Sequence, residues 1–196
     1  MIMDGGGVKS ERLFLALYPR PEIVSRLEKE TAALARRYPL PGLRWIPASH
    51  LHLTLLFLGE VTNEQRRELI PGLEQLADRQ RPFDIAPASY AYFPNRKRAR
   101  VFYLALRESG PLRELAGEIG HACREVVSGA SATAFRPHIT LARMGRRFKA
   151  HDALPAGGQP APWQQRVDSF HLVKSDLSAG GAKYTVVHTF FLPETK

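Results

Sequence analysis

The chain repeats one pattern: an apolar strand, an amphipathic helix, and a second strand that opens with His-x-Thr. The first copy runs from RLFLAL at 12–17 to HLT at 52–54, and the second from RVFYLAL at 100–106 to HIT at 138–140. About 40 residues separate the opening arginine from the histidine in both copies. Agreement in order, spacing and motif indicates two related halves, so that each half contributes one His-Thr pair.

The rest of the chain also alternates between strands and helices. Thr62 is predicted to cap a helix that runs to about Ala77, with Gln65 in its first turn. Other helices are expected from Glu22 to Pro39 and from Pro111 onward, where apolar residues recur at helical spacing. Strands are predicted over 13–18, 52–58, 83–93 with a break at Pro87, 100–106, 138–143, 166–174 and 183–192, and a long loop over 150–165.

Composition favours a globular protein with an affinity for polyanions. Hydrophobic residues make up 44% of the 196, and no apolar run approaches the roughly 20 residues that a membrane helix needs. The net charge is +9, with one basic group at Arg96-Lys97-Arg98 and another over 143–149. Such charge attracts nucleic acids, although a solvated basic surface is the alternative.

Residues 1–10 contain three consecutive glycines and no apolar segment, so we predict a disordered leader and not a secretory signal. Cys123 is the single cysteine, which suits a reducing compartment, and we expect a cytoplasmic protein. The helical pattern around Cys123 favours a buried core residue, and a catalytic thiol is the alternative. Residues 11–196 are expected to form one domain.

The two His-x-Thr motifs point to acid–base chemistry. Residues i and i+2 of a strand share a face, so His52 projects with Thr54, and His138 with Thr140. If the copies pack about a pseudo-two-fold axis, two imidazoles and two hydroxyls surround one small volume. With an unperturbed pKa of about 6.5, one imidazole can accept a proton while the other donates one.

Phosphoryl transfer matches this arrangement, because attacking and leaving oxygens lie on opposite sides of the phosphorus. Threonine hydroxyls can donate to the non-bridging oxygens, and Arg143 can supply a fork of further donors. Arg143 follows Thr140 by three residues, which places it on the other face of a flat strand. Its participation therefore requires a strand end or a bend.

Core packing and metal binding are the alternative roles for these histidines. A single histidine in an apolar strand is commonly a packed core residue, but two matched His-x-Thr motifs are hard to explain by packing. A zinc site is the second alternative, since His50 and His52 share a face, but no H-E-x-x-H motif or cysteine cluster accompanies them. We expect no metal and no cofactor. The remaining histidines are interpreted as surface or packing residues.

The sequence resembles a known family at several points. HLTL at 52–55 with FLG at 57–59, and RPHITL at 136–141 with Arg143, resemble the paired H-x-T-x motifs of the 2H phosphoesterase superfamily. The nearest branch is the RNA 2′,3′-cyclic phosphodiesterases, also called 2′-5′ RNA ligases. RLFLA at 12–16 and WIP at 45–47 fit the same branch, so the resemblance covers nearly the whole chain from Arg12 to about Leu192.

The resemblance implies an α+β, bilobal fold with two pseudo-two-fold-related antiparallel sheets lining a central cleft, and helices outside. It implies metal-independent hydrolysis of 2′,3′-cyclic phosphate RNA ends to 2′-phosphates, with reversible 2′-5′ ligation. By position, His52 would be the general acid and His138 the general base, while Thr54, Thr140 and Arg143 would bind phosphate. The expected partner is RNA with cyclic phosphate ends, no membrane is involved, and the protein is expected to be a monomer.

Contacts to the rest of the RNA are harder to place. Phe14, Trp45 and Phe102 are interpreted first as core residues, with stacking on a terminal base as the alternative, and Tyr184 fits either role. Arg96, Lys97 and Arg98 could contact RNA or form a solvated hairpin tip. Two rival functions remain: an activity on small nucleotides such as ADP-ribose cyclic phosphate or 2′-5′ oligoadenylate, and a non-catalytic RNA-binding module.

Overall fold

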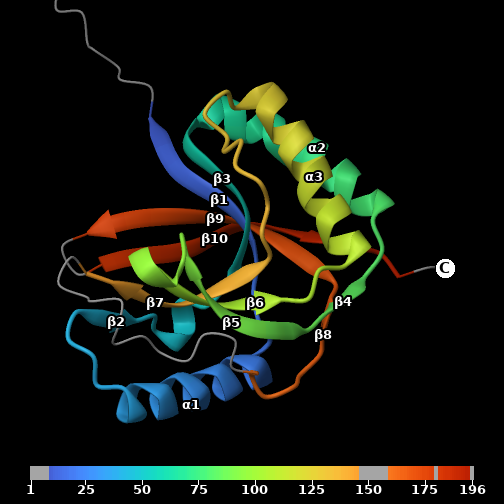
Figure 1. Cartoon of the computed structure of the whole chain (residues 1–196). Helices are drawn as coiled ribbons and strands as arrows, with labels where there is room; N and C mark the ends of the chain where they lie inside the picture. The colour runs from blue at the N-terminus through green and yellow to red at the C-terminus, as the bar shows by residue number, and fades with distance from the viewer. Residues whose placement is uncertain (1–8, 146–158, 179–180, 195–196) are drawn as a thin grey trace, which may run out of the picture.

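The computed structural model describes residues 9–145, 159–178 and 181–194, so residues 1–8 of the predicted leader and most of the 150–165 loop lie outside it. The leader prediction is wrong at Ser10, which begins the first strand. Within these residues lie helices α1 (Pro21–Arg37), α2 (Asn63–Arg79) and α3 (Gly110–Val126). The strands are β1 (Ser10–Leu17), β2 (Leu43–Trp45), β3 (Leu53–Thr62), β4 (Phe83–Ile85), β5 (Pro87–Phe93), β6 (Val101–Leu106), β7 (His138–Met144), β8 (Gln165–Val167), β9 (Ser169–Ser178) and β10 (Gly181–Phe191). Two short 3₁₀ turns, η1 (Ala48–His50) and η2 (Arg96–Arg98), complete the set (Figure 1).

Eight strands form one antiparallel sheet, in the order β10-β9-β1-β3-β7-β6-β5, with β2 paired to β7. The α+β fold is therefore confirmed. The two expected sheets are the two halves of this sheet, one around β1 and β3 and the other around β6 and β7. They join between β3 and β7, where a single residue pair, Leu53 opposite Ile139, links the ladders. β4 and β8 form a separate two-stranded sheet.

The helices lie at opposite ends of the molecule in Figure 1, with α2 and α3 side by side and α1 apart from them. α1 follows β1 in the chain, but its Glu30 accepts a hydrogen bond from Tyr90 of β5 in the other half (2.9 Å). α3 follows β6 and packs against β3 of the first half. Each connecting helix therefore braces the opposite half of the sheet, which ties the two halves into one unit.

Local sequence signals explain several boundaries. The Thr62 side chain accepts from the Gln65 backbone at 3.2 Å, and the Gln65 side chain accepts from the Thr62 backbone at 3.0 Å, so the predicted cap is confirmed as a full capping box.

The prediction of one strand over 166–174 is wrong, because β8 ends at Val167 and β9 begins at Ser169. Between them the Asp168 carbonyl accepts a bond from Leu192.

The central sheet is hydrophobic on both faces. Alternate residues of β1 show this most clearly: Leu13 and Leu15 belong to the main core, which the helices cover, whereas Phe14 and Ala16 belong to a second, smaller cluster with Val173. Because successive side chains of a strand point to opposite faces, the second cluster lies on the face away from the main core. Cys123 is fully buried in the main core, as predicted.

The junction between the halves gives a stability prediction. Leu53 is 1% exposed at the single β3–β7 pair, whereas Leu177 is 67% exposed. We expect Leu53→Ala to lower the free energy of unfolding by about 2–5 kcal/mol, because it opens a cavity in the core. Leu177→Ala, the matched control, should change it by less than about 0.5 kcal/mol. Equal effects of the two substitutions in urea denaturation would contradict this account of the junction.

Candidate active site

The Leu53–Ile139 pair brings the two His-x-Thr motifs together. Both residues of this pair are buried, so the side chains on either side of them project from the opposite face of the sheet. Continuing the antiparallel register by one residue each way sets His52 across from Thr140, and Thr54 across from His138. The imidazoles thus occupy diagonal corners of a four-residue site, and diagonal residues of an antiparallel pair are typically about 7–8 Å apart. A phosphate group fits between side chains at that spacing.

Both imidazoles are held in the same way. Nδ1 of His52 lies 2.8 Å from the carbonyl oxygen of His50, and Nδ1 of His138 lies 2.7 Å from that of Arg136. A carbonyl oxygen can only accept, so each Nδ1 carries a hydrogen and donates it. The other ring nitrogen, Nε2, is left as the atom that exchanges protons in both residues. The backbone therefore fixes the tautomer and the ring orientation at both motifs.

A bulge at the same place in both halves extends the site. In the β1–β3 ladder the pairing steps from Ala16–Thr54 to Leu15–Leu56, and in the β6–β7 ladder from Tyr103–Thr140 to Phe102–Ala142. Each step leaves one leucine without a partner, either Leu55 or Leu141. As a result, two successive residues of each strand are buried, Leu55 with Leu56 and Leu141 with Ala142. Beyond them the alternation between the two faces continues, shifted by one residue.

The bulge brings Arg143 to the side of the sheet that carries His138 and Thr140. The burial pattern of β7 shows this, because Leu141 and Ala142 are both buried while Arg143 is exposed. The bend that the sequence required for Arg143 is therefore present. In β3 the corresponding position is Phe57, which is 53% exposed. One half of the site thus presents a guanidinium group where the other presents an aromatic ring.

Electrostatics place the charged members of the site close to one another. The pKa of His52 lies below its usual value, first because burial disfavours the cation, and then because His138 and Arg143 are positive neighbours. The pKa of His138 is lowered by burial and by Arg143. In both histidines the hydrogen bond to the backbone carbonyl acts against this and raises the pKa. The free site therefore favours neutral imidazoles and the binding of an anion.

Aromatic rings surround both histidines. Phe14 and Tyr184 lie 5.1 and 5.2 Å from the His52 ring centroid. Phe93 and Tyr103 lie 4.9 and 5.2 Å from that of His138. The sequence analysis missed Phe93 and Tyr103, because the sequence of their strands does not indicate which side chains lie on the face that carries His138.

The predicted RNA contacts fall into different environments. Phe14 and Tyr184 lie beside His52 and also contact each other, at 5.3 Å. Trp45 packs edge-on against Phe102, 6.1 Å away. Phe102 is completely buried, which confirms its interpretation as a core residue; the regular alternation along β6 presents Tyr103 to the other face instead.

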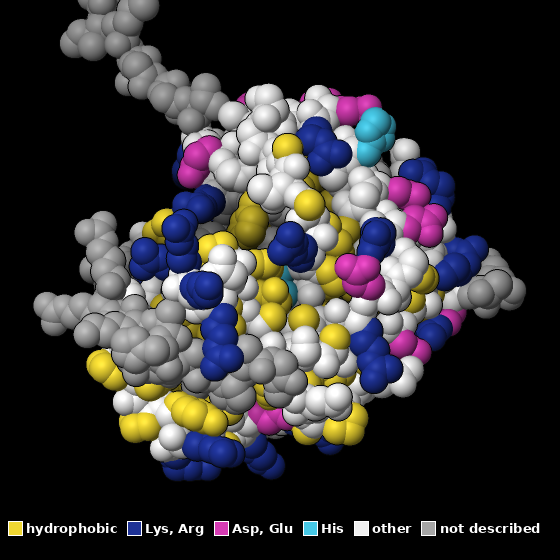
Figure 2. Space-filling view, in the orientation of Figure 1, with side chains coloured by type: hydrophobic (Ala, Val, Ile, Leu, Met, Phe, Trp, Pro, Cys, Tyr) yellow, Lys and Arg dark blue, Asp and Glu magenta, His cyan; other side chains and the backbone are white. Residues whose placement is uncertain are grey.

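Basic residues gather on the second half. Arg96, Lys97 and Arg98 form η2, an exposed turn whose Asn95 side chain accepts from the Arg98 backbone at 3.1 Å. Arg44 of β2 was missed from the sequence, yet it pairs directly opposite Arg143. Figure 2 shows a hollow on one face with hydrophobic side chains within it, Lys and Arg side chains around it, and a histidine in its depth. This distribution of charge suits an anionic ligand.

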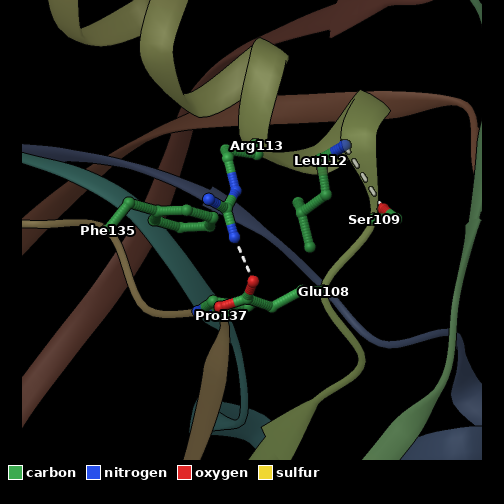
Figure 3. Close-up of a pocket in the computed structure, with 6 residues that line it drawn as sticks. All are labelled: Glu108, Ser109, Leu112, Arg113, Phe135 and Pro137. Atoms are coloured by element: carbon green, nitrogen blue, oxygen red, sulfur yellow. Dashed lines mark hydrogen bonds and ion pairs between the residues drawn. The ribbon is translucent and has the colours of Figure 1, made fainter.

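A separate small pocket lies behind the segment that leads into β7 (Figure 3). Arg113 of α3 reaches toward Glu108 and forms an ion pair with it, and the Phe135 ring lies beside the guanidinium. Pro137 lines the same pocket, and its carbonyl oxygen accepts from the Leu106 backbone at 3.0 Å. These contacts fix the residue that immediately precedes His138, so the pocket supports the active-site strand.

Metal-binding clusters and membrane-spanning helices are both absent from the described part of the chain. Among residues 9–145, 159–178 and 181–194, no group of three or more His, Cys, Asp or Glu side chains is placed to hold a metal ion. Over the same residues, no helix combines the length and apolar character needed to cross a membrane. Metal independence of the reaction stays a prediction, which a chelator can test.

Comparison with known proteins identifies the family. Residues 20–179 match the profile of the 2′-5′ RNA ligase superfamily, and the chain belongs to this family. It is 32% identical over 187 residues to the RNA 2′,3′-cyclic phosphodiesterase of Thermus thermophilus, covering 92% of this chain and 90% of that protein. The namesake from Escherichia coli is 30% identical over 188 residues, covering 94% and 98%.

Solved structures of similar proteins share this fold. The crystal structure of a Thermus thermophilus protein superposes with a TM-score of 0.76 at 30% identity, covering 94% of this chain and 100% of that one. Escherichia coli LigT complexed with 3′-AMP superposes with a TM-score of 0.77 at 28% identity, covering 95% and 100%. LigT has also been solved with phosphate.

The electrostatics of the site give a prediction for Arg143. Because its positive charge lowers the pKa of both histidines, Arg143→Gln should raise the pKa of His52 and of His138 together. The titration of the imidazole nitrogens in NMR spectra measures both values. Arg107→Gln is the matched control, since Arg107 hydrogen-bonds the Pro87 carbonyl. Unchanged titration of both histidines in Arg143→Gln would show that the guanidinium does not act on them.

Proposed function

We propose that this protein is an RNA 2′,3′-cyclic phosphodiesterase, which hydrolyses cyclic phosphate ends to 2′-phosphates by acid–base catalysis between two histidines. The single observation that carries the proposal is the Leu53–Ile139 pairing, whose register, continued by one residue each way, sets each histidine across from the threonine of the other half. Relatives that span nearly the whole chain bear this name, which supports the same activity here.

The proposed reaction has one proton acceptor and one proton donor. Neutral His138 takes a proton through Nε2 from a water molecule, whose oxygen attacks the phosphorus. The bond between phosphorus and the 3′ oxygen breaks, and protonated His52 donates its Nε2 hydrogen to that oxygen. The product carries a 2′-phosphate and a free 3′-hydroxyl. The diagonal positions of the imidazoles suit this in-line displacement, because one ring lies on each side of the phosphate.

Thr54, Thr140 and Arg143 are proposed to bind the non-bridging oxygens. Each threonine faces the histidine of the other half across the β3–β7 junction, so a phosphate held by both hydroxyls lies between the two rings. The guanidinium of Arg143 adds a positive charge where negative charge develops in the transition state. A bound phosphate would also offset the positive neighbours and raise the pKa of His52, which favours the protonated acid.

A second candidate is an activity on small nucleotides. Escherichia coli LigT has been solved with NADP⁺ and with ATP, so that relative accommodates nucleotides that are not RNA ends. Comparison of kcat/KM for a short RNA with a cyclic end and for 2′,3′-cyclic AMP separates the two candidates. The non-catalytic RNA-binding module stays as the remaining alternative, and it predicts binding without any turnover.

The remaining expectations belong to the same proposal. RNA beyond the terminal nucleotide is proposed to contact Arg96, Lys97 and Arg98, and Arg44 extends this basic strip toward Arg143. Phe14 and Tyr184 would lie beside the terminal nucleoside, since both contact the His52 ring. Trp45 is a weaker candidate because it packs against the core ring of Phe102. A monomeric state and a cytoplasmic location also stay predictions.

Histidine substitutions test the proposal directly. In the presence of a chelator, His52→Ala and His138→Ala should each lower kcat on a 2′,3′-cyclic-phosphate RNA by roughly 10²–10⁴-fold, because each removes one proton-transfer group. His121→Ala is the matched control, since His121 is an exposed residue of α3 paired with Glu125 at 3.5 Å, and its activity should equal that of the wild type. Full activity in either of the first two variants, or complete loss in chelator, would refute the mechanism.

The pH dependence gives an independent test. Catalysis needs one neutral and one protonated imidazole, so kcat/KM should follow a bell whose two apparent pKa values belong to the pair. Both pKa values are lowered from 6.5 in the free protein, so the maximum should lie below about pH 6.5. A maximum of kcat/KM well above about pH 7.5 would contradict the electrostatics described for the site.

A further inference from the structure

Two aromatic rings beside His138 form a stacked pair that the hydrolysis of a cyclic phosphate does not use. Phe93 of β5 and Tyr103 of β6 lie face to face, with ring centroids 4.1 Å apart and planes at 19°. Both rings also meet the His138 imidazole nearly edge-on, at 79° and 65°. Both are half-buried, so each keeps surface that solvent or a ligand can reach.

The two aromatic rings beside His52 are arranged differently, because Phe14 and Tyr184 meet edge-on, at 74°. Phe14, beside His52, is 3% exposed and packs in the smaller cluster with Val173. The pair beside His138 has small neighbours instead: Ala105 pairs opposite His138, and Ala91 pairs opposite Tyr103. Small side chains next to partly exposed rings leave room for a flat ligand. The two halves therefore share their histidines and threonines, but the face-to-face aromatic stack lies only beside His138 among the rings described for the site.

Arg136 joins the stack to the catalytic histidine. Its carbonyl oxygen accepts from Nδ1 of His138 at 2.7 Å, and its guanidinium carbon lies 6.0 Å from the centroid of the Phe93 ring. A ligand on the stack would thus meet a positive charge as well as an aromatic face. Aromatic faces next to arginine are typical binding surfaces for nucleobases of single-stranded nucleic acids.

We propose that the Phe93–Tyr103 stack is a second nucleoside subsite, which binds the base of a nucleoside whose 5′-hydroxyl replaces water as the attacking group. This inference rests on the proposed function. The 5′ oxygen bonds to phosphorus, and its proton goes to Nε2 of His138. The bond from phosphorus to the 3′ oxygen breaks, and His52 protonates that oxygen. The product is a 2′-5′ phosphodiester, and cleavage of such a linkage follows the same steps in reverse.

The side of the site on which the stack lies supports this assignment. The attacking group gives its proton to His138, so it approaches from the His138 side. A nucleoside that attacks through its 5′ oxygen then has its base near the rings that contact His138. Water needs no such surface. The stack is therefore expected to favour nucleoside attack over hydrolysis.

The test compares two reactions of the same enzyme. One is hydrolysis of 2′,3′-cyclic AMP, and the other is cleavage of a 2′-5′-linked diadenosine monophosphate. In Tyr103→Leu and Phe93→Leu, the ratio of kcat/KM for the dinucleotide to that for the cyclic nucleotide should fall roughly tenfold or more, because a stacked base loses its platform. Tyr103→Trp keeps an aromatic face and should retain the wild-type ratio.

Thr140→Val is the matched control. It acts on the phosphate that both reactions share, so both kcat/KM values should fall together and leave the ratio within about twofold of the wild type. Thermal unfolding of every variant checks that the fold is kept. The same ratio in both leucine variants as in the wild type would show that the rings only pack the imidazole, and would overturn the inference.

Wild-type controls separate this inference from the proposed function. A protein that hydrolyses 2′,3′-cyclic AMP but never cleaves the dinucleotide would refute the second subsite and leave the phosphodiesterase intact. A protein that turns over neither the cyclic nucleotide nor a cyclic-phosphate RNA would refute the proposed function itself.

Discussion

The active site depends on one contact between the halves of the chain, the pairing of Leu53 with Ile139. Their burial turns the flanking His-Thr pairs to the other face, and the antiparallel register sets each histidine opposite the threonine of the other half. Because a shift of one residue would send all four side chains into the core, the register is strongly specified. The helices contribute by bracing each half against the other across this junction.

The two halves of the site are nearly symmetric at the histidines but differ in the residues around them. Both imidazoles donate through Nδ1 to a carbonyl two residues earlier, and both lose basicity through burial. Beyond the bulges the halves diverge, since Arg143 lies on one side and Phe57 on the other. Two chemically alike histidines can thus take different roles because their neighbours differ. In the proposed mechanism the repeated backbone presents the proton-transfer groups, and the divergent side chains orient the substrate.

The sequence predicted those parts of the site that depend on local geometry. His52 with Thr54, and His138 with Thr140, share a face because strand alternation is fixed by the backbone. The Thr62 cap was equally local. The sequence could place Arg143 in the site only on the condition that its strand bends. Whether the strand bends was not predictable, because a bulge depends on pairing with a distant strand. Tyr103 was missed because RVFYLAL has one residue more than RLFLAL, so the sequence did not show which of its aromatic residues corresponds to Phe14; Phe102 is buried and Tyr103 lies on the other face.

Other residues were beyond prediction because sequence alone does not give strand order. Arg44 pairs with Arg143 although the two lie far apart in the chain, and nothing in its local pattern indicates this. Phe93 contacts His138 directly from the outer strand β5, across β6. The helices also cross to the opposite halves, which the strand–helix–strand pattern does not imply. Tertiary pairing, and not local propensity, decides each of these positions.

The central claim is that two imidazoles act on one phosphorus atom. A crystal structure with adenosine 2′-monophosphate bound tests it most directly. The account predicts a phosphate between the motifs, with Nε2 of His52 and Nε2 of His138 each about 2.7–3.2 Å from a different oxygen of the nucleotide. A phosphate bound to only one of the two rings, or bound away from both, would contradict it.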